Sequence, residues 1–525
     1  MSQFKRWMKS AGVSLLAVVT LCSCATQGTT TSSAPQTSSG GETESSASSK
    51  ESQESAEPTE ISITFSGFST DALNPESPIF LKLQELTNTK LNLNIIPDSA
   101  YKDKLSAMIA GNTLPEVIYL PDMTTNTTVT AIKAGIFWEI GPYLSEYENL
   151  SQVSEDGWIR ASVEGKIYGL FRERNLARLG IQYREDWAEN VGITKPPETI
   201  DEFYDMCVKF TNNDPDGNGV DDTFAVSFQS SMATMPTILS WFGAGPGKNF
   251  EMVDGEIRHV MQNEGYYEGL KFIRKLYEEG LCNQDFISVT QRADNFRAGK
   301  AGILLSSVED AVKNYTELAK LIPDAKVRVS GPVDAGHGLN AAADTSGSKG
   351  SYAFPTTVVK DEEQLKGILE FFDKMNTTEV NNLLKYGIEG VHYTVEDGKA
   401  VYTDEQTTLR LADANDLSNL QTFSLTINPA MPEKMNDLQQ QIQDVLAVND
   451  QYARPSATSG LVSETESKKG AELRKSLEDA QAKFVMGQIS EEELRAAFDK
   501  WLADGGTDIL NEYNESYQKA LQNVE

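Results

Sequence analysis

The sequence predicts an α/β fold with more than one lobe, and three observations lead to this prediction. Side chains alternate between apolar and polar at 61–65 and at 91–95, and a short apolar run occupies 117–120, which is typical of strands. Apolar side chains at helical spacing occupy 78–86 and 99–111, between these strands. Residues 59–525 also exceed the length that a single hydrophobic core usually supports.

The segments between 61 and 120 form two successive strand–helix–strand units. Pro78 opens the first helix, and Ser99 is placed to cap the second, which ends at Gly111. Such units build parallel sheets, whose ligands collect beyond the carboxyl ends of the strands. We therefore expect Asp71, after the first strand, and Asp122, after the third, to face a ligand crevice. The alternative is that both residues only shape loops and caps.

The first 24 residues have the pattern of a bacterial secretion signal. Positive charge at positions 5, 6 and 9 precedes an apolar run at 11–21 that is too short to span a membrane as a stable helix. The run ends in Leu21-Cys22-Ser23-Cys24, which resembles the lipobox of bacterial lipoproteins. We expect removal of residues 1–23 and attachment of a lipid to Cys24. The alternatives are lipidation at Cys22 and secretion without an anchor.

Residues 24–58 form a predicted disordered tether. From 25 to 58 there is no Val, Ile, Leu, Met or aromatic residue, so this stretch cannot bury a core. The formal net charge of −31 argues against nucleic acid as a partner and against a basic membrane-binding face. The expected location is the extracytoplasmic face of the cell membrane, with the body at 59–525 held by the lipid anchor alone. Whether Cys207 pairs with Cys282 is left open.

A series of short segments carries a family resemblance that covers nearly all of the chain from about residue 61. The segments are, in chain order, KLSAMIAG at 104–111, LPEVI at 114–118, AGIF at 134–137, PYL at 142–144, EGKIYGL at 164–170, YREDW at 183–187, KLYEEGL at 275–281, FRAGKAG at 296–302 and YGIEGVHY at 386–393. In their order and spacing they resemble the extracellular solute-binding proteins (family 1) of carbohydrate ABC importers, and in particular the LplA-like lipoprotein branch.

The resemblance implies a two-lobe, periplasmic-binding-protein-like (type II) α/β fold with discontinuous lobes joined by a hinge. It assigns 59–182 and 328–360 to the first lobe, and 183–327 and 361–525 to the second, with chain crossings near 179–183, 327–330 and 355–360. It implies a monomeric, non-catalytic receptor that binds an oligosaccharide between the lobes and delivers it to an ABC permease. The alternatives are a receptor for a peptide or signal molecule and a glycoside hydrolase, whose paired carboxylates any acidic chain can offer.

The strongest local motif is a loop with oxygen-bearing side chains at alternate positions, followed by a turn at Gly219. This spacing lets one loop surround a hard cation, so we expect a structural Ca²⁺. Position 12 of the loop is Ala225, so the bidentate Glu of a full EF-hand is absent, and the alternative is an Asx-rich turn without metal. The loop is similar to calcium loops of related alginate-type binding proteins. The candidate ligands are Asp214, Asp216, Asn218, Asp222 and the backbone of Val220.

Sugar recognition needs flat aromatic faces and planar polar groups. Trp241, beside small residues at 243–245, is the first candidate, and Trp158 with Arg160 is the second; the alternative for each Trp is a place in the core. Further candidates come from the last segment of the resemblance, where the alternative is a turn without ligand contact. These are Glu389, His392 and Tyr393.

Four arginines lie between positions 172 and 184 of this acidic chain. A guanidinium group can hold a carboxylate at two points, so this group could recognise a uronic acid in a polysaccharide fragment. We assign Arg184 to the ligand on this basis. The alternative is that the four arginines pair with the abundant Asp and Glu, which leaves a neutral oligosaccharide open as the ligand. The four are Arg172, Arg174, Arg178 and Arg184.

Overall fold

The computed structural model describes residues 57–69, 72–154, 157–158, 162–230, 235–245, 249–343, 347–454 and 456–523. The expected lipidation site Cys24, together with Asp71 and Arg160, lies outside these residues. The predicted α/β class is confirmed, because helices surround two separate sheets of four and five strands.

The first sheet has five strands in the order β2-β1-β3-β11-β4. The strands β1 (Thr59–Gly67), β2 (Thr89–Pro97) and β3 (Val117–Leu120) are parallel, as the sequence predicts. β11 (Ser348–Ala353) comes from much later in the chain and pairs antiparallel with both β3 and β4 (Gly169–Glu173). Ile61, Ile63 and Phe65 of β1 are fully buried, which confirms the alternation seen in the sequence.

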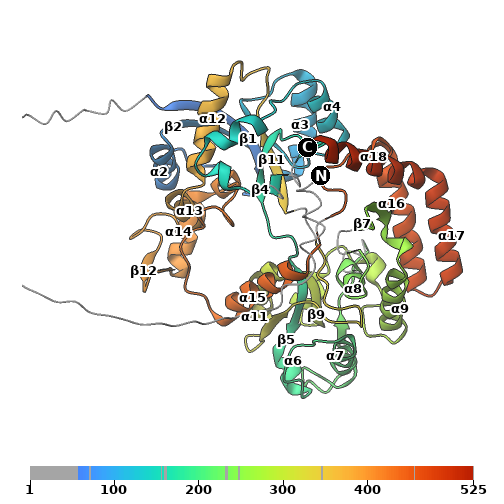
Figure 1. Cartoon of the computed structure of the whole chain (residues 1–525). Helices are drawn as coiled ribbons and strands as arrows, with labels where there is room; N and C mark the ends of the chain where they lie inside the picture. Colours follow the sequence, from blue (N-terminus) through green and yellow to red (C-terminus); the bar gives the residue numbers. More distant parts are fainter. Residues whose placement is uncertain are drawn as a thin grey trace, which may run out of the picture. The chain divides into compact units, whose positions relative to one another are not determined.

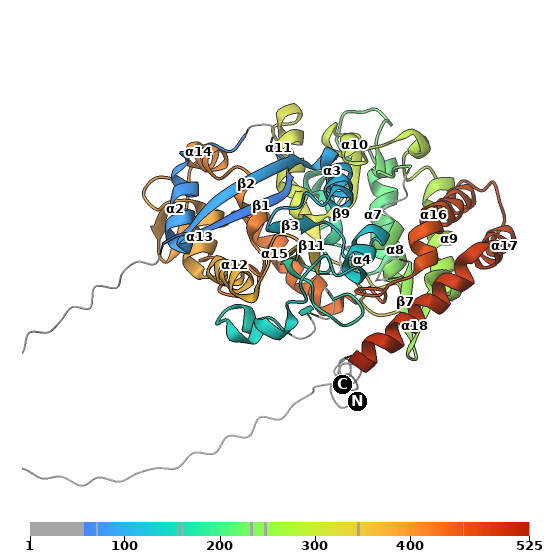
Figure 2. The same ribbon diagram turned by 90° about the horizontal axis from the view of Figure 1, so that it is seen from above.

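The helices α2 (Pro78–Thr87), α3 (Asp98–Gly111) and α4 (Asn126–Lys133) belong to this part of the chain. Ser77 caps α2 by accepting a hydrogen bond from the Phe80 N–H, and Pro78 takes the first helical position. Ser99 does not cap α3, because this helix begins one residue earlier, at Asp98, and places Ser99 in its first turn. Figures 1 and 2 show α2 and the later helix α12 beside β1 and β2.

A later stretch completes the first core. It contains α12 (Glu362–Met375), α13 (Thr378–Tyr386), α14 (Asp404–Ala414) and the short helix η6 (Leu417–Leu420). Apolar side chains from Leu365 to Ile427 share one hydrophobic cluster with those of the first sheet. This differs from the expected division, which gave all of 361–525 to the second lobe.

The second sheet has four strands in the order β10-β5-β9-β6. β5 (Leu179–Arg184) is antiparallel to both β10 (Val327–Ser330) and β9 (Ala301–Ser307), and β6 (Phe224–Val226) is parallel to β9. The helices of this stretch of the chain are α6 (Glu185–Asn190), α7 (Ile200–Asn212), α8 (Met235–Trp241), α9 (Glu264–Glu278), α10 (Ala293–Arg297) and α11 (Ala311–Leu321). Cys207 and Cys282 are buried here as free thiols.

The last helices of the chain pack on the second sheet and its helices. α15 (Asp437–Tyr452) inserts Ile442 and Leu446 against Val308 and Val329. α16 (Glu464–Val485) lies along α9 and packs with α17 (Glu491–Trp501) and α18 (Thr507–Asn523), as Figure 1 shows. The third passage between the two cores therefore lies between Ile427 and Asp437, and not near 355–360 as expected.

The remaining elements are short. Two hairpins are formed by β7 (Phe250–Val253) with β8 (Glu256–His259), and by β12 (Thr394–Glu396) with β13 (Lys399–Val401). The short helices are η1 (Gly141–Glu146), η2 (Leu150–Gln152), η3 (Val260–Gln262), η4 (Phe286–Ser288), η5 (Val308–Asp310) and η7 (Leu502–Gly506). Within the described ranges, no helix is both long enough and apolar enough to cross a membrane.

The structure predicts that Trp241→Ala strongly destabilises the protein. Trp241 is 1% exposed and its ring meets that of Phe203 edge to face at a centroid distance of 5.0 Å. Removing so large a buried side chain should lower the free energy of unfolding by about 3–5 kcal/mol, measured by urea denaturation. Phe68→Ala is the control, because Phe68 is 60% exposed and its loss should cost less than about 0.5 kcal/mol. Equal stability of Trp241→Ala and the parent protein would contradict the buried position.

Candidate ligand-binding site

The carboxyl edge of the first sheet is a place where an open α/β sheet can hold a ligand. β1, β3 and β4 end at this edge, and antiparallel β11 begins there, because Ser351 pairs with Leu120 and Ser348 pairs with Glu173. Two connections to the second sheet also start or finish here, at 174–178 and 331–347. Ligands of open α/β sheets bind beyond the carboxyl ends of the strands. Side chains at this edge are therefore candidates for ligand recognition.

A cluster of cationic side chains occupies this edge. Arg172, near the end of β4, is buried and donates a hydrogen bond from one Nη to the Asn419 side-chain oxygen at 2.9 Å. Its guanidinium group lies 5.6 Å from the centre of the Tyr119 ring. Its Nε is buried without a hydrogen-bond partner among the described residues. A buried donor without an acceptor is costly, so this position favours an incoming acceptor.

Lys349, at the start of β11, is held next to these arginines. Burial is the main factor that lowers the pKa of Lys349 to about 8, and the neighbouring charges of Arg172 and Arg174 lower it further. The Arg178 charge also lowers the pKa of Lys349, whereas the Asp98 charge raises it. Like charges gathered at one place repel each other, and a bound anion would relieve this repulsion. We call Arg172, Arg174, Arg178 and Lys349 the basic edge.

An exposed aromatic ring adjoins the basic edge. The Lys349 Nζ lies 4.9 Å from the centre of the Phe68 ring, and 60% of Phe68 is exposed. The backbone there is fixed by Asp416, whose carboxylate accepts hydrogen bonds from the Phe68 and Ser69 N–H groups, both at 3.0 Å. The apolar ring can contact the C–H surface of a sugar, and the neighbouring cations can bind its acidic groups.

The second sheet contributes groups at the corresponding edge. Arg178 reaches Glu309, which follows β9, with a distance of 2.7 Å between Nη1 and Oε2. Arg292 is fixed by hydrogen bonds to the Leu305 carbonyl, the Ser306 hydroxyl and the Gln229 side-chain oxygen. Burial lowers the pKa of Arg292. The basic edge is therefore linked directly to a polar edge of the second sheet.

Four of the residues predicted to contact a ligand are buried among protein groups instead. Trp241 lies in the core against Phe203. Arg184 is 2% exposed, binds both carboxylate oxygens of Asp186 and stacks over Trp187 at 4.7 Å. The Asp186 carboxylate therefore takes the two-point contact that we expected from a uronate. His392 and Tyr393 complete the set.

His392 and Tyr393 are buried for the same kind of reason. The His392 ring accepts a hydrogen bond from the Ile388 N–H at 3.0 Å, and its Nε2 lies 3.0 Å from the Asp413 carboxylate. Tyr393 packs against Tyr386 with a centroid distance of 5.5 Å. Both side chains therefore shape the turn at 387–393 and are not available to a ligand in this structure. This is the turn that the sequence left open as the alternative.

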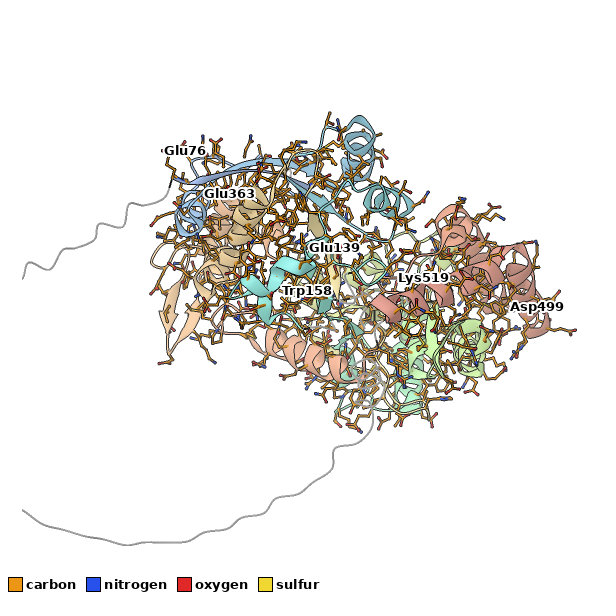
Figure 3. All side chains as sticks on the ribbon, turned by 45° about the horizontal axis from the view of Figure 1, so that its top comes forward. Glu76, Glu139, Trp158, Glu363, Asp499 and Lys519 are labelled. Carbon is orange, nitrogen blue, oxygen red and sulfur yellow. The ribbon has the colours of Figure 1, made fainter. Side chains whose placement is uncertain are left out.

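Three of the other candidates stay predictions. Trp158, labelled in Figure 3, is half-buried. Its ring meets those of Phe171 and Phe423 edge to face at centroid distances of 5.4 and 5.3 Å. Asp122 is exposed after β3, and its carboxylate accepts hydrogen bonds from the N–H and hydroxyl of Thr124. Glu389 is exposed in its turn.

Phe68 and Lys349 were missed by the sequence analysis. Phe68 could have been noticed, because it is a large apolar residue directly after the first strand. Lys349 had no local signal, because its place depends on the pairing of β11 with strands formed more than 170 residues earlier in the chain.

The predicted calcium loop folds so that its oxygen atoms approach one another. The Asp214 carboxylate accepts hydrogen bonds from the Asn218 and Gly219 N–H groups, and the Asn218 amide lies 2.9 Å from Asp216 and 3.4 Å from Asp222. Burial, together with the other two carboxylates, raises the pKa of Asp216. Among the residues that the structure describes, no group of three or more His, Cys, Asp or Glu side chains has a geometry that could hold a metal ion.

Comparison with known proteins identifies the family. Residues 75–382 match the bacterial extracellular solute-binding protein family. The chain is similar to a polygalacturonan/rhamnogalacturonan-binding protein, YtcQ of Bacillus subtilis, with 32% identity over 85% of this chain and 89% of that one. It is also similar to the lipoprotein LipO of the same organism, with 31% identity over 86% of this chain and 91% of that one.

A solved structure shows the same fold. It is the S. pneumoniae ABC-transporter substrate-binding protein FusA, an EF-hand mutant in complex with fructo-nystose, with a TM-score of 0.61. The two chains are 15% identical, and the match covers 89% of this chain and 100% of that one. The fold is thus that of a two-lobe, periplasmic-binding-protein-like solute-binding protein. This chain belongs to the bacterial extracellular solute-binding protein family, as the resemblance in the sequence indicated.

The depressed pKa of Lys349 predicts an unusual dependence of stability on pH. The pKa is about 8 in the folded protein and near its ordinary value of 10.5 when unfolded. Between these values the unfolded state binds more protons, so this group makes the free energy of unfolding rise with pH. Lys349→Met should reduce the rise, measured by urea denaturation between pH 7 and 10. Lys475→Met, on the exposed surface of α16, is the control. A rise of unchanged size in Lys349→Met would contradict the crowding of charges.

Proposed function

We propose that the protein is an extracytoplasmic receptor that binds an acidic oligosaccharide at the basic edge and delivers it to an ABC permease. The observation that carries the proposal is Lys349, packed at the end of a sheet with Arg172, Arg174 and Arg178 although the whole chain has a net charge of −31. Such crowding disfavours the protein without a ligand and favours a bound anion. The relative named for polygalacturonan and rhamnogalacturonan supports the same class of ligand, because galacturonate units carry carboxylates.

The proposed mechanism is a change in the population of open and closed forms. One lobe contains the first sheet and the other contains the second sheet, and the connections at 174–178 and 435–436 act as hinge segments. Ligand contacts with both lobes favour the closed form, which the permease then recognises. The chemistry needed is recognition and release, so the protein binds the sugar chain as a monomer without cleaving it.

We also infer that the body is tethered to the membrane through a lipid on Cys24, after removal of residues 1–23. The support comes from the lipobox-like ending of the signal, from the apolar-poor stretch at 25–58, and from the similarity to a protein named as a lipoprotein. The tether keeps the receptor near the permease, on the extracytoplasmic side.

A structural Ca²⁺ in the loop at 214–222 is a further part of the proposal. The approach of three carboxylates with a raised Asp216 pKa supports it, because a divalent cation would neutralise their repulsion. The side chains of Asp214, Asp216, Asn218 and Asp222 would hold the ion with the Val220 carbonyl. They would have to rotate, because the Asn218 amide now lies between two of the carboxylates. The ion would stabilise the end of α7 and take no part in ligand chemistry.

Removal of calcium should lower the melting temperature of the protein. A ligand that binds only the folded state stabilises it, so EDTA should shift the thermal transition down by a few degrees and added Ca²⁺ should restore it. In Asp214→Asn the two conditions should give the same transition. Superimposable melting curves of the parent protein in EDTA and in Ca²⁺ would exclude the ion.

The proposed function predicts a preference for acidic over neutral sugar chains. Calorimetric titration should give tight binding to oligogalacturonates and weak binding to uncharged galactose oligomers of the same length. Lys349→Met and Arg172→Gln should each weaken binding of the acidic chain about 10- to 100-fold, because each removes a charged contact worth about 1.5–3 kcal/mol. Arg258→Gln is the control, because Arg258 is an exposed arginine of β8 paired with Glu256.

Two results would contradict the proposal. Equal affinity of the parent protein for acidic and neutral chains would show that the basic edge does not select the ligand. Shortened sugar chains in the recovered titration mixture would show a glycoside hydrolase instead of a receptor.

A further inference from the structure

A pocket lies in the part of the chain that builds the first core, outside the basic edge. It has a volume of about 470 Å³ and lies between α13, α14 and the segment from 418 to 433. Figure 1 shows α13, α14 and β12 grouped together in this region. Pockets for small ligands have volumes of about 300–1,000 Å³, so one or two sugar units can fit.

Arg410 of α14 is one of the charged residues that line this pocket, together with Lys385 and Glu433. Its side chain is half-buried, and burial is the main factor that lowers its pKa. Within the described part of the chain, Arg410 has no hydrogen bond and no ion pair. Tyr402 and Glu433 are the titratable groups whose fields act on it. A desolvated cation without a paired anion is unfavourable, and a bound carboxylate would compensate for it.

The nearest carboxylate is already engaged by other groups. Glu433 accepts a hydrogen bond from the Tyr402 hydroxyl and lies 3.4 Å from the Lys385 Nζ. Its field favours the charged form of Arg410, but Glu433 makes no hydrogen bond or ion pair with the guanidinium. The guanidinium is left for a group that enters the pocket from outside, and its planar fork matches a carboxylate at two points.

The rest of the pocket suits a sugar. Ser418, Thr407 and the side chain of Gln421 offer polar groups, and Leu425 with the partly exposed ring of Tyr402 offers apolar surface. Gln421 is held by a hydrogen bond from its Nε2 to the Asn381 side-chain oxygen at 3.0 Å, which leaves its own carbonyl oxygen as an acceptor for a hydroxyl. Polar groups that are fixed in place beside apolar surface are typical of carbohydrate sites.

The wall of the pocket is bonded directly to the basic edge. Glu173, the residue after Arg172, donates its N–H to the Thr422 carbonyl at 2.7 Å. Its carboxylate accepts hydrogen bonds from the N–H groups of Leu425 and Thr426, both at 3.0 Å. An oligosaccharide bound at the basic edge would therefore lie next to the wall of the Arg410 pocket.

We propose that the Arg410 pocket is a second acidic-sugar subsite, which binds a further uronate unit of the same oligosaccharide that occupies the basic edge. The inference rests on the proposed function and adds to it a requirement on ligand length. Short acidic chains fill the basic edge alone, and longer chains reach Arg410 and gain a second charged contact.

The test is calorimetric titration of the protein with oligogalacturonates of two to six units. Arg410→Gln should leave affinity for the shortest chain that binds unchanged and should weaken binding of the longest chains about 10-fold or more, as expected for one lost charged contact. Thr407→Trp, which fills the pocket without removing the charge, should give the same pattern. Arg258→Gln is the matched control and should bind every length as the parent protein does.

The outcomes separate this inference from the proposed function. Unchanged affinity of Arg410→Gln for all lengths, or an equal loss at every length, would overturn the second subsite while the parent protein still binds acidic chains. Failure of the parent protein to bind any oligogalacturonate would overturn the proposed function itself. The melting temperature of Arg410→Gln without ligand should equal or exceed that of the parent, because the variant lacks a desolvated charge. A large decrease would show that Arg410 is structural.

Discussion

The insertion of β11 between β3 and β4 is the constraint on which the rest of the site depends. The ladder pairs Ser351 with both Leu120 and Phe171, so backbone hydrogen bonds fix a late segment between two early ones. Lys349 lies in the irregular stretch of β11 between the paired residues Ser348 and Ser351, where its charge is close to that of Arg172. The repulsion that favours an anion is therefore a consequence of strand pairing, and the energy of the folded sheet maintains it.

A small network of polar side chains stabilises the carboxyl edge of the first sheet. Asn419 donates hydrogen bonds from its Nδ2 to the Ser66 carbonyl and the Asp416 carboxylate, and accepts one from Arg172. The Tyr352 hydroxyl donates to the Asn419 carbonyl. One residue of η6 thus joins β1, β4 and β11. Because these contacts are buried, the positions of Phe68, Arg172 and Lys349 are coupled, and the site is rigid on the side of the first sheet.

The sequence alone predicted the structural features that depend on local patterns of side chains. It predicted the parallel strands, the helices between them and the α/β class, while the ligand role of the carboxyl edge stays a prediction. The arginine group was recognised, but Arg184 was chosen from it, although Asp186 two residues later takes its two-point contact. Trp241 was chosen for its small neighbours, and packing against Phe203 buries it. The position of Lys349 and the packing of residues 361–427 in the first core depend on long-range contacts, which local sequence patterns do not predict. Asp71 and Cys24 stay predictions.

The central claim is that the basic edge holds the carboxylate of a sugar chain, and a crystal structure of the protein with a bound oligogalacturonate tests it most directly. The account predicts a uronate carboxylate within 4 Å of the Lys349 Nζ or the Arg172 guanidinium, a distance of about ion-pair length, with a sugar ring against the exposed face of Phe68. A chain bound elsewhere, or one whose carboxylates all face solvent at this edge, would contradict the claim.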